Sequence, residues 1–241
     1  SARTVSTHAL NIFGDHSDVM ACRQTGFAML CEGNVQEVMD LSPVAHLAAL
    51  TGKVPFINFF DGFRTSHEIQ KIAVWDYKDL AEMCDMDAVK AFREHALNPE
   101  HPHMRGSHEN GDTFFQHREA CNQYYDALPE VVESYMDKIN AKLGTDYKLF
   151  NYYGAADADR VIVAMGSICD VAEEVIDYLN AHGEKVGLIK VRLFRPFAAE
   201  KLVEAIPATC KKIAVLDRTK EPGSLGEPLY QDVVTALANA G

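Results

Sequence analysis

Several features that identify common protein classes are missing from this chain of 241 residues. Its six cysteines are widely scattered, no two form a C-x-x-C motif, and no apolar signal segment opens the chain. This spacing argues against a disulfide framework and against zinc or iron–sulfur ligand sets, and predicts buried free thiols in a reducing compartment. No apolar run approaches the ~20 residues that cross a bilayer. We therefore expect a cytoplasmic protein without a membrane partner.

A basic surface is also missing. The 23 basic and 35 acidic residues leave a formal charge of −12, and no stripe of lysine and arginine interrupts the acidic balance. Nucleic acid is therefore not an expected partner. The composition, 47% hydrophobic and 24% charged, is ordinary for a globular protein, and the length allows one large or two modest domains.

The common catalytic and phosphate-binding motifs are absent as well. The chain has no G-x-G-x-x-G, no G-x-x-x-x-G-K-[ST] and no G-x-S-x-G. Gly166-Ser167 follows an expected strand and could hold a phosphate, but a plain tight turn is the favoured interpretation. Histidines at 95, 101, 103, 108 and 117 lie near two acidic residues without the spacing of a closed metal site, so no metal is predicted.

The stretch from Phe59 to Glu68 carries the strongest local pattern. An apolar run from Val54 to Phe60 predicts a buried parallel strand, which Asp61-Gly62 interrupts. Thr65 and Glu68 have the spacing of a capping box, so a helix is expected to begin there. Ligands of open α/β sheets bind at such strand ends, although a capped turn without a ligand fits the pattern equally well.

The remaining pattern predicts strands that alternate with helices. In the first part we expect a strand over 8–13, helices over 19–30 and 35–50 with a kink or restart at Pro43, helices over 78–84 and 87–97, a long loop over 98–112, and a helix over 129–143. A domain boundary is expected within 145–153. After it we expect strands over 161–165, 187–194 and 213–216 and helices over 170–183, 199–206 and 229–238. The fold class is therefore α/β, with two open, mainly parallel sheet modules flanked by helices.

A polar loop over 217–230 leaves the last expected strand. Its place at the carboxyl end of a strand suits a binding site. Its opposite charges could equally pair with each other or with a neighbouring domain, and we favour that structural role.

Several runs are specific enough to indicate a family. They are SAR at 1–3, HALNIFGDHSDVM at 8–20, RQTGFAML at 23–30, FDGFRTSHE at 60–68, NPEHP at 98–102, LIKVRLFRPF at 188–197 and LDRTKEPG at 216–223. Together they closely resemble pyruvate:ferredoxin (flavodoxin) oxidoreductase, and the resemblance covers essentially the whole chain. It implies a large, multidomain, homodimeric cytoplasmic enzyme that oxidatively decarboxylates pyruvate with CoA to acetyl-CoA and CO2.

The resemblance implies that this chain is one piece of that enzyme. Residues 1–146 resemble the later part of its first, thiamine diphosphate-associated domain, and residues 147–241 resemble its transketolase-C-terminal-like second domain. The start at Ser1, without an initiator methionine, is expected if the chain is cut from something longer. The implied cofactors of the full enzyme are thiamine diphosphate, Mg2+ and 4Fe-4S clusters, with CoA as co-substrate. Their known ligands find no match here, so the piece alone is expected to hold no cofactor and to be inactive.

One functional residue follows from the resemblance. Arg3 matches the arginine that grips the pyruvate carboxylate, a role that suits a planar, two-pronged cation. The turn from Asp61 to Glu68 is interpreted as framework or as an inter-subunit contact. The implied partners are the other domains of the polypeptide, a second copy, and ferredoxin or flavodoxin. Two alternatives stay open: a scaffold or dimerisation region without a site, and a related 2-oxoacid oxidoreductase with another substrate.

Overall fold

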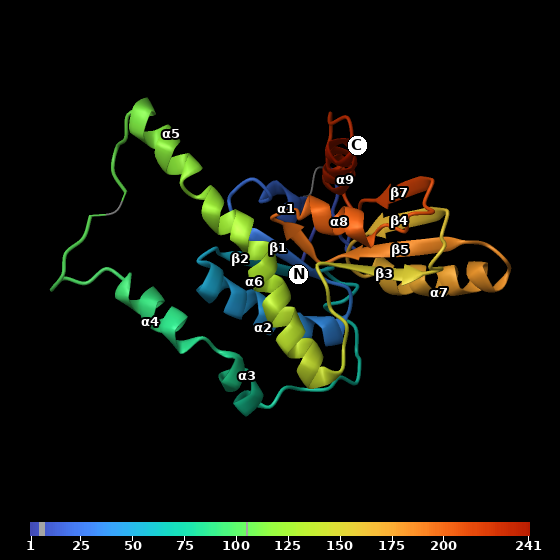
Figure 1. The fold of residues 1–241 in the computed structure, drawn as a ribbon, viewed down its shortest axis with the longest axis horizontal. Helices are drawn as coiled ribbons and strands as arrows, with labels where there is room; N and C mark the ends of the chain where they lie inside the picture. Colours follow the sequence, from blue (N-terminus) through green and yellow to red (C-terminus); the bar gives the residue numbers. More distant parts are fainter. Residues whose placement is uncertain (5–7, 105) are drawn as a thin grey trace.

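The computed structural model describes residues 1–4, 8–104 and 106–241. Helices and strands alternate along most of the chain (Figure 1). In chain order they are α1 Ser17–Ala21, β1 Ala28–Glu32, α2 Val35–Gly52, β2 Phe56–Phe60, α3 Tyr77–Met83, α4 Met86–Glu94, α5 Gly111–Glu119, α6 Asn122–Leu143, β3 Phe150–Gly154, β4 Arg160–Ala164, α7 Ile168–Ala181, β5 Val186–Val191, β6 Leu193–Arg195, α8 Ala199–Ala205, β7 Lys212–Leu216 and α9 Pro228–Ala240.

The strands form two sheets, which confirms the predicted fold class. The first sheet has the order β2-β1-β6, with β1 parallel to β2 and antiparallel to β6. The second has the order β3-β5-β4-β7, in which β4 is parallel to both neighbours and β3 is antiparallel to β5. In each sheet a helix connects parallel strands, as the short-range alternation of the sequence predicts.

One strand passes from the second sheet to the first. The sequence predicts a single strand over 187–194, and this is wrong, because the chain divides at Arg192 into β5 and β6. In β6, Leu193 pairs with Leu30 of β1, so the first sheet includes a strand from the second half of the chain. Leu30 and Phe194 are fully buried in a hydrophobic core that both sheets share. This crossing holds the two sheets together.

Helices cover the sheets from several sides. α2 packs on β1 and β2, and the long α6 packs on α2 so closely that a Cβ on Gly52 would lie 2.4 Å from Leu128 Cδ1. α7 covers one face of the second sheet, while α8 and α9 lie against the other (Figure 1). α2 begins at Asn34, whose side chain accepts the Glu37 N–H, and it runs through Pro43 without a restart.

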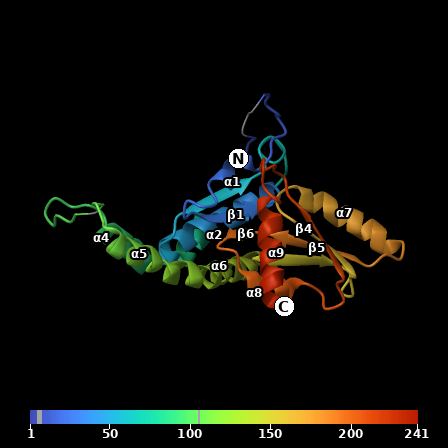
Figure 2. The ribbon, with the colours of Figure 1, turned by 90° about the horizontal axis from the view of Figure 1, so that it is seen from above.

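The segment from α3 to α5 reaches away from the sheets, although Met83 of α3 is buried in the core and α4 touches α2. Figures 1 and 2 show α4 and α5 at its far end, and neither helix contains a buried residue. Ile69 is 99% exposed and Phe92 68% exposed. The predicted loop over 98–112 is irregular up to 110, where α5 follows; Arg105 lies outside the described residues. We call residues 65–121 the arm.

Three predicted elements in the first part are wrong. Residues 8–13 form bends and turns instead of a strand, because the Asn11 side chain accepts the Phe13 N–H ahead of the left-handed Gly14. The expected helix over 19–30 stops with α1, and after Gly26, at φ 95°, the chain enters β1, whose five residues are all buried. No helix begins at Thr65, whose hydroxyl instead donates to Gly33 O at 3.3 Å.

Two further boundaries differ from the sequence pattern. α6 begins at Asn122, so Pro129 lies inside the helix and not in its first turn. Its end at Gly144, which adopts the left-handed conformation, is as predicted. β3 overlaps the segment that we expect to hold the domain boundary, and its antiparallel pairing with β5 has no distinct local signal.

Candidate functional site

Strands of both sheets end at one place. Asp61 follows β2 and Gly33 follows β1 in the first sheet, while Gly166 and Ser167 follow β4 and Arg218 follows β7 in the second. A Cβ on Gly33 would lie 3.3 Å from Gly166 O, which shows how closely the two strand ends approach. The carboxyl ends of parallel strands are where α/β proteins place their ligands.

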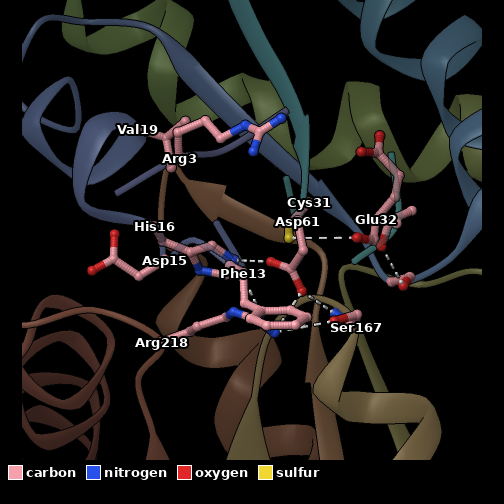
Figure 3. Close-up of polar contacts among 12 residues, drawn as sticks. Arg3, Phe13, Asp15, His16, Val19, Cys31, Glu32, Asp61, Ser167 and Arg218 are labelled. Atoms are coloured by element: carbon pink, nitrogen blue, oxygen red, sulfur yellow. Dashed lines mark hydrogen bonds and ion pairs between the residues drawn. The ribbon is translucent and has the colours of Figure 1, made fainter. Parts of the chain in front are cut away.

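The Asp61 carboxylate is the centre of this junction. It is 1% exposed and accepts hydrogen bonds from His16 Nε2, from the Ser167 N–H at 2.7 Å and from Arg218 Nη1 at 3.2 Å (Figure 3). Burial alone would raise the pKa of Asp61, but the hydrogen bonds from His16 and Ser167 outweigh burial and lower the pKa to about 2. The carboxylate is therefore ionised at neutral pH and joins three parts of the chain.

Further hydrogen bonds brace the partners of Asp61. The His16 N–H donates to Arg218 O at 2.8 Å, and Arg218 Nη2 donates to Phe13 O at 3.0 Å. Arg218 Nη1 also lies 3.2 Å from Ser167 Oγ. The turn before α1 is thus held to the end of β7. We call His16, Asp61, Ser167 and Arg218 the Asp61 cluster.

The charged residues of the polar loop over 217–230 pair partly with each other and partly with residues outside the loop, among them Glu221 with Arg23 at 2.8 Å. Asp217 accepts the N–H groups of Leu229 and Tyr230, both at 2.9 Å, at the start of α9. Lys220 and Glu227 form an ion pair with Nζ and Oε1 2.7 Å apart. The same loop also supplies Arg218 to the Asp61 cluster.

Arg3 lies beside the Asp61 cluster without joining it. The Ala2 N–H donates to Phe60 O at 2.7 Å and the Gly62 N–H donates to Ala2 O at 2.9 Å, so Ala2 docks at the end of β2. Arg3 is half-buried, its N–H donates to Asp18 Oδ2 at 2.9 Å, and its Nη1 lies 3.5 Å from Ile12 O. Figure 3 shows the Arg3 side chain running apart from the Asp61 carboxylate.

A second buried polar group lies behind the junction. Glu32, at the end of β1, is 0% exposed, and neither of its carboxyl oxygens has a hydrogen-bond partner among the described residues. Burial, and then the neighbouring Glu37 charge, raise the pKa of Glu32 well above its usual range. Burial opposes ionisation of Glu37 too, but an ion pair at 2.7 Å from Arg192 Nη1 lowers its pKa. Glu37 is therefore charged, and Glu32 is shifted toward the neutral acid.

The sequence locates some of these residues and misses others. It singles out the Asp61 turn, Gly166-Ser167 and the loop that holds Arg218, and the structure brings all three together. It misses His16, which appears there only within the run over 8–20. It also misses two buried charged residues in apolar runs, Glu32 and Arg192. A charged residue within an apolar run was the signal that could have identified them.

The other candidate residues of the sequence do not converge. His117 Nδ1 lies 2.7 Å from Glu109 Oε1 in the arm, but within the described part of the chain no three His, Cys, Asp or Glu side chains gather as a metal-binding group.

All six cysteines are free; Cys31 and Cys169 are buried and the other four are half-buried. Burial raises the pKa of Cys31 and Cys169, so neither thiol is activated. Among the described helices, none has the length and apolar character to span a bilayer.

Comparison with known proteins identifies the family. The model of the thiamine diphosphate-binding region of pyruvate flavodoxin/ferredoxin oxidoreductase matches residues 1–137, and the model of pyruvate:ferredoxin oxidoreductase core domain II matches residues 158–240. The chain belongs to the pyruvate flavodoxin/ferredoxin oxidoreductase family. The resemblance seen in the sequence is thereby confirmed.

Relatives in this family are much longer than the chain. It is 64% identical over 241 residues to pyruvate:ferredoxin oxidoreductase from Moorella thermoacetica and 61% identical over 240 residues to pyruvate-flavodoxin oxidoreductase from Enterobacter agglomerans. These alignments cover all of this chain but 21% and 20% of the relatives. The chain therefore spans about a fifth of their length.

A solved structure shares the fold. It is 2-oxoglutarate:ferredoxin oxidoreductase from Magnetococcus marinus, with 2-oxoglutarate, coenzyme A and succinyl-CoA bound. The likeness covers 98% of this chain and 42% of that chain, with a TM-score of 0.57 and 19% sequence identity. At that identity the likeness shows the arrangement of the helices and strands alone.

Proposed function

We propose that this chain forms part of an enzyme that oxidatively decarboxylates pyruvate with CoA, yielding acetyl-CoA and CO2 and passing two electrons to ferredoxin or flavodoxin. The observation that carries the proposal is the 64% identity over all 241 residues to a pyruvate:ferredoxin oxidoreductase. The 52% identical pyruvate dehydrogenase [NADP(+)] of Cryptosporidium parvum also has pyruvate in its name. The complete polypeptide, and not this piece alone, would carry the activity.

We further propose that the piece spans two domains, 1–146 and 147–241, the second transketolase-C-terminal-like. The two family models, which leave 138–157 between them, support a division in that region. The enzyme is proposed to act in the cytoplasm as a homodimer, with 4Fe-4S clusters in other domains.

The family description names thiamine diphosphate, but this chain offers no evident site for it. The turn best placed to hold a phosphate, Gly166-Ser167, already gives its Ser167 N–H to the Asp61 carboxylate at 2.7 Å. No group of metal-binding side chains that could hold Mg2+ is present in the described residues. We therefore assign no residue to the diphosphate or to its metal, and we place them on domains outside this chain.

Arg3 is the proposed contact for the substrate carboxylate. It lies at the carboxyl ends of the strands, and the residue is half-buried, so part of it can be reached from solvent. A guanidinium binds a carboxylate through two parallel N–H···O bonds, and hydrogen bonds to charged groups contribute about 1.5–3 kcal/mol each. The fixed positive charge favours a 2-oxoacid anion over a neutral carbonyl compound.

Replacement of Arg3 tests the proposal in the complete enzyme. Arg3→Ala is expected to lower kcat/KM for pyruvate by roughly 100-fold, which corresponds to about 3 kcal/mol. Arg3→Lys is expected to recover little, because an ammonium cannot form the paired hydrogen bonds. The matched control is Arg160→Ala, at the opposite end of β4, whose exposed ion pairs with Asp159 and Glu184 lie away from the junction.

The result divides the alternatives. If pyruvate kinetics of Arg3→Ala stay within threefold of the parent, the assignment of Arg3 is wrong. If the parent enzyme oxidises 2-oxobutyrate or 2-oxoglutarate faster than pyruvate, the chain serves a related 2-oxoacid oxidoreductase instead.

The arm favours a structural contribution as well. Its helices α4 and α5 have no buried residue, yet Phe92, Phe114 and Phe115 are between 55% and 68% exposed. α4 touches α2 but buries no residue there, and short helices with so little packing are marginal in water, so a covering surface would stabilise them. We propose that other domains of the polypeptide or a second copy of it provide that cover.

A further inference from the structure

We propose that Gly62 and Asp18 position Arg3 for its substrate, acting through contact with Arg3 and not through contact with the substrate. The proposal rests on the proposed function, in which Arg3 binds the 2-oxoacid carboxylate. The Asp61–Gly62 turn, which the sequence offered as framework, then has a specific task. It determines where the guanidinium lies.

The backbone before Arg3 is fixed by the end of β2. Ala2 is 1% exposed and pairs with Asp61 as one more strand residue, with its N–H 2.7 Å from Phe60 O and its carbonyl 2.9 Å from the Gly62 N–H. Because both polar groups of Ala2 are used, the chain leaves the sheet edge in one direction. The position of Ala2 therefore fixes where the backbone of Arg3 begins.

Asp18 holds the backbone of Arg3 itself. Its Oδ2 accepts the Arg3 N–H at 2.9 Å, and the Asp18 N–H donates to Arg3 O at 3.3 Å. Asp18 lies in the first turn of α1, so the helix carries the contact. The backbone of Ala2 and the backbone of Arg3 are both fixed by hydrogen bonds. Only the side chain of Arg3 is left to change conformation.

Gly62 leaves the space through which that side chain passes. A Cβ on Gly62 would lie 2.2 Å from Ala2 O and 2.8 Å from both Cδ and Nε of Arg3. Real Cβ atoms do not approach other atoms so closely. The φ of Gly62 is not in the left-handed region, so glycine is required here because a side chain would not fit and not because of the backbone conformation. An alanine at 62 would displace the Ala2 carbonyl and the Arg3 stem together.

The turn that carries Gly62 is itself fixed from both sheets. The Asp61 carboxylate binds His16, Ser167 and Arg218, so the residue before Gly62 cannot shift to relieve a clash. A methyl group at 62 must therefore be accommodated on the Arg3 side. Angstrom-scale misplacement of a binding group costs orders of magnitude in rate, which sets the scale of the expected effect.

The test is a double-mutant cycle in the complete enzyme. Gly62→Ala is expected to raise the KM for pyruvate at least 10-fold while the KM for CoA stays near that of the parent. In an Arg3→Ala background the same substitution is expected to change the pyruvate KM less than twofold, because the group that it displaces is gone. Gly111→Ala is the matched control, since a Cβ there meets nothing within 4 Å.

Other outcomes separate the inference from the proposed function. If Gly62→Ala raises the pyruvate KM equally in both backgrounds, its effect does not pass through Arg3 and the inference is wrong, while the function of Arg3 stands. If Arg3→Ala alone has no effect on pyruvate kinetics, the proposed function of Arg3 fails first. If Gly62→Ala does not fold, Asp18 supplies the measurement. Asp18→Ala should then raise the pyruvate KM several-fold only when Arg3 is present, and Asp18→Asn, which keeps an acceptor oxygen, should restore it; the absence of this pattern overturns the inference.

Discussion

Replacement of Asp61 by asparagine removes the charge on which the junction depends. The side chain keeps its size, and it keeps one oxygen that can accept the Ser167 N–H. It loses the charge-assisted bonds from His16 and Arg218. The expected result is a junction that opens more often, with the sheets themselves intact.

The magnitude follows from the pKa of Asp61. A fall from the ordinary value of 3.8 to about 2 is a difference of about 1.8 pKa units, or about 2.4 kcal/mol of stability at neutral pH. Asp61 is almost fully buried, so solvent screening does not reduce this figure much. Because the folded pKa is depressed, the stabilisation is present above about pH 4.5 and is lost as the pH falls toward 2.

Hydrogen exchange in the complete protein measures this local stability. At pH 7 the peptides that contain Ser167 and His16 should exchange about 60-fold faster in Asp61→Asn, since 2.4 kcal/mol corresponds to that factor. Between pH 5 and 3 the parent should lose protection at these peptides and the variant should change little. Asp157→Asn is the control, because Asp157 pairs with Lys185 on the exposed surface. Equal protection of parent and Asp61→Asn at pH 7 would refute the reasoning that this carboxylate is held ionised by its partners.

Two further substitutions test the interior. Glu32 has a raised pKa, so its contribution to stability is present at acidic pH and is lost as the pH rises. Glu32→Gln should abolish that loss. At pH 8 the β1 amides of the variant should therefore exchange more slowly than those of the parent. A parent whose β1 protection does not fall between pH 5 and 8 would contradict this. Leu128→Ala should destabilise the contact of α6 with α2 by roughly 2–5 kcal/mol, seen as faster exchange in both helices, whereas Leu225→Ala, at a fully exposed site, should have no effect. Equal exchange in the two variants would show that the contact tolerates the cavity.

Where local pattern and burial agree, the sequence predicts the fold well. The apolar run before Asp61 forms β2, although β2 is an edge strand of which only Phe59 is buried and not the buried strand that the run predicts. The alternation after residue 160 gives the other strands of the second sheet besides β3, because crossover helices and parallel strands leave clear periodicities. The helix expected over 19–30 fails for the opposite reason. Ala28 to Glu32 form a strand because their neighbours in space are β2 and β6, and β6 comes from more than 160 residues later in the chain.

The candidate site shows the same division. The sequence marks the Asp61 turn, the turn after β4 and the polar loop after β7 as separate strand ends. Their convergence on one carboxylate depends on how the two sheets pack, and the capping box expected at Thr65 is lost because its hydroxyl bonds to Gly33 instead. His16 carries no pattern that would identify it before the chain is folded.

The fold class and the family could be predicted from the amino-acid sequence, since local periodicity and family-specific runs need no geometry; the role of Arg3 as a substrate contact rests on the same runs and stays a prediction. The tertiary structure alone decided that His16, Ser167 and Arg218 hold Asp61 ionised, that Glu32 is buried without a partner, and that Gly62 leaves room for Arg3. Hydrogen bonds, desolvation and steric contact depend on distances in space, and here they join residues as many as 205 positions apart.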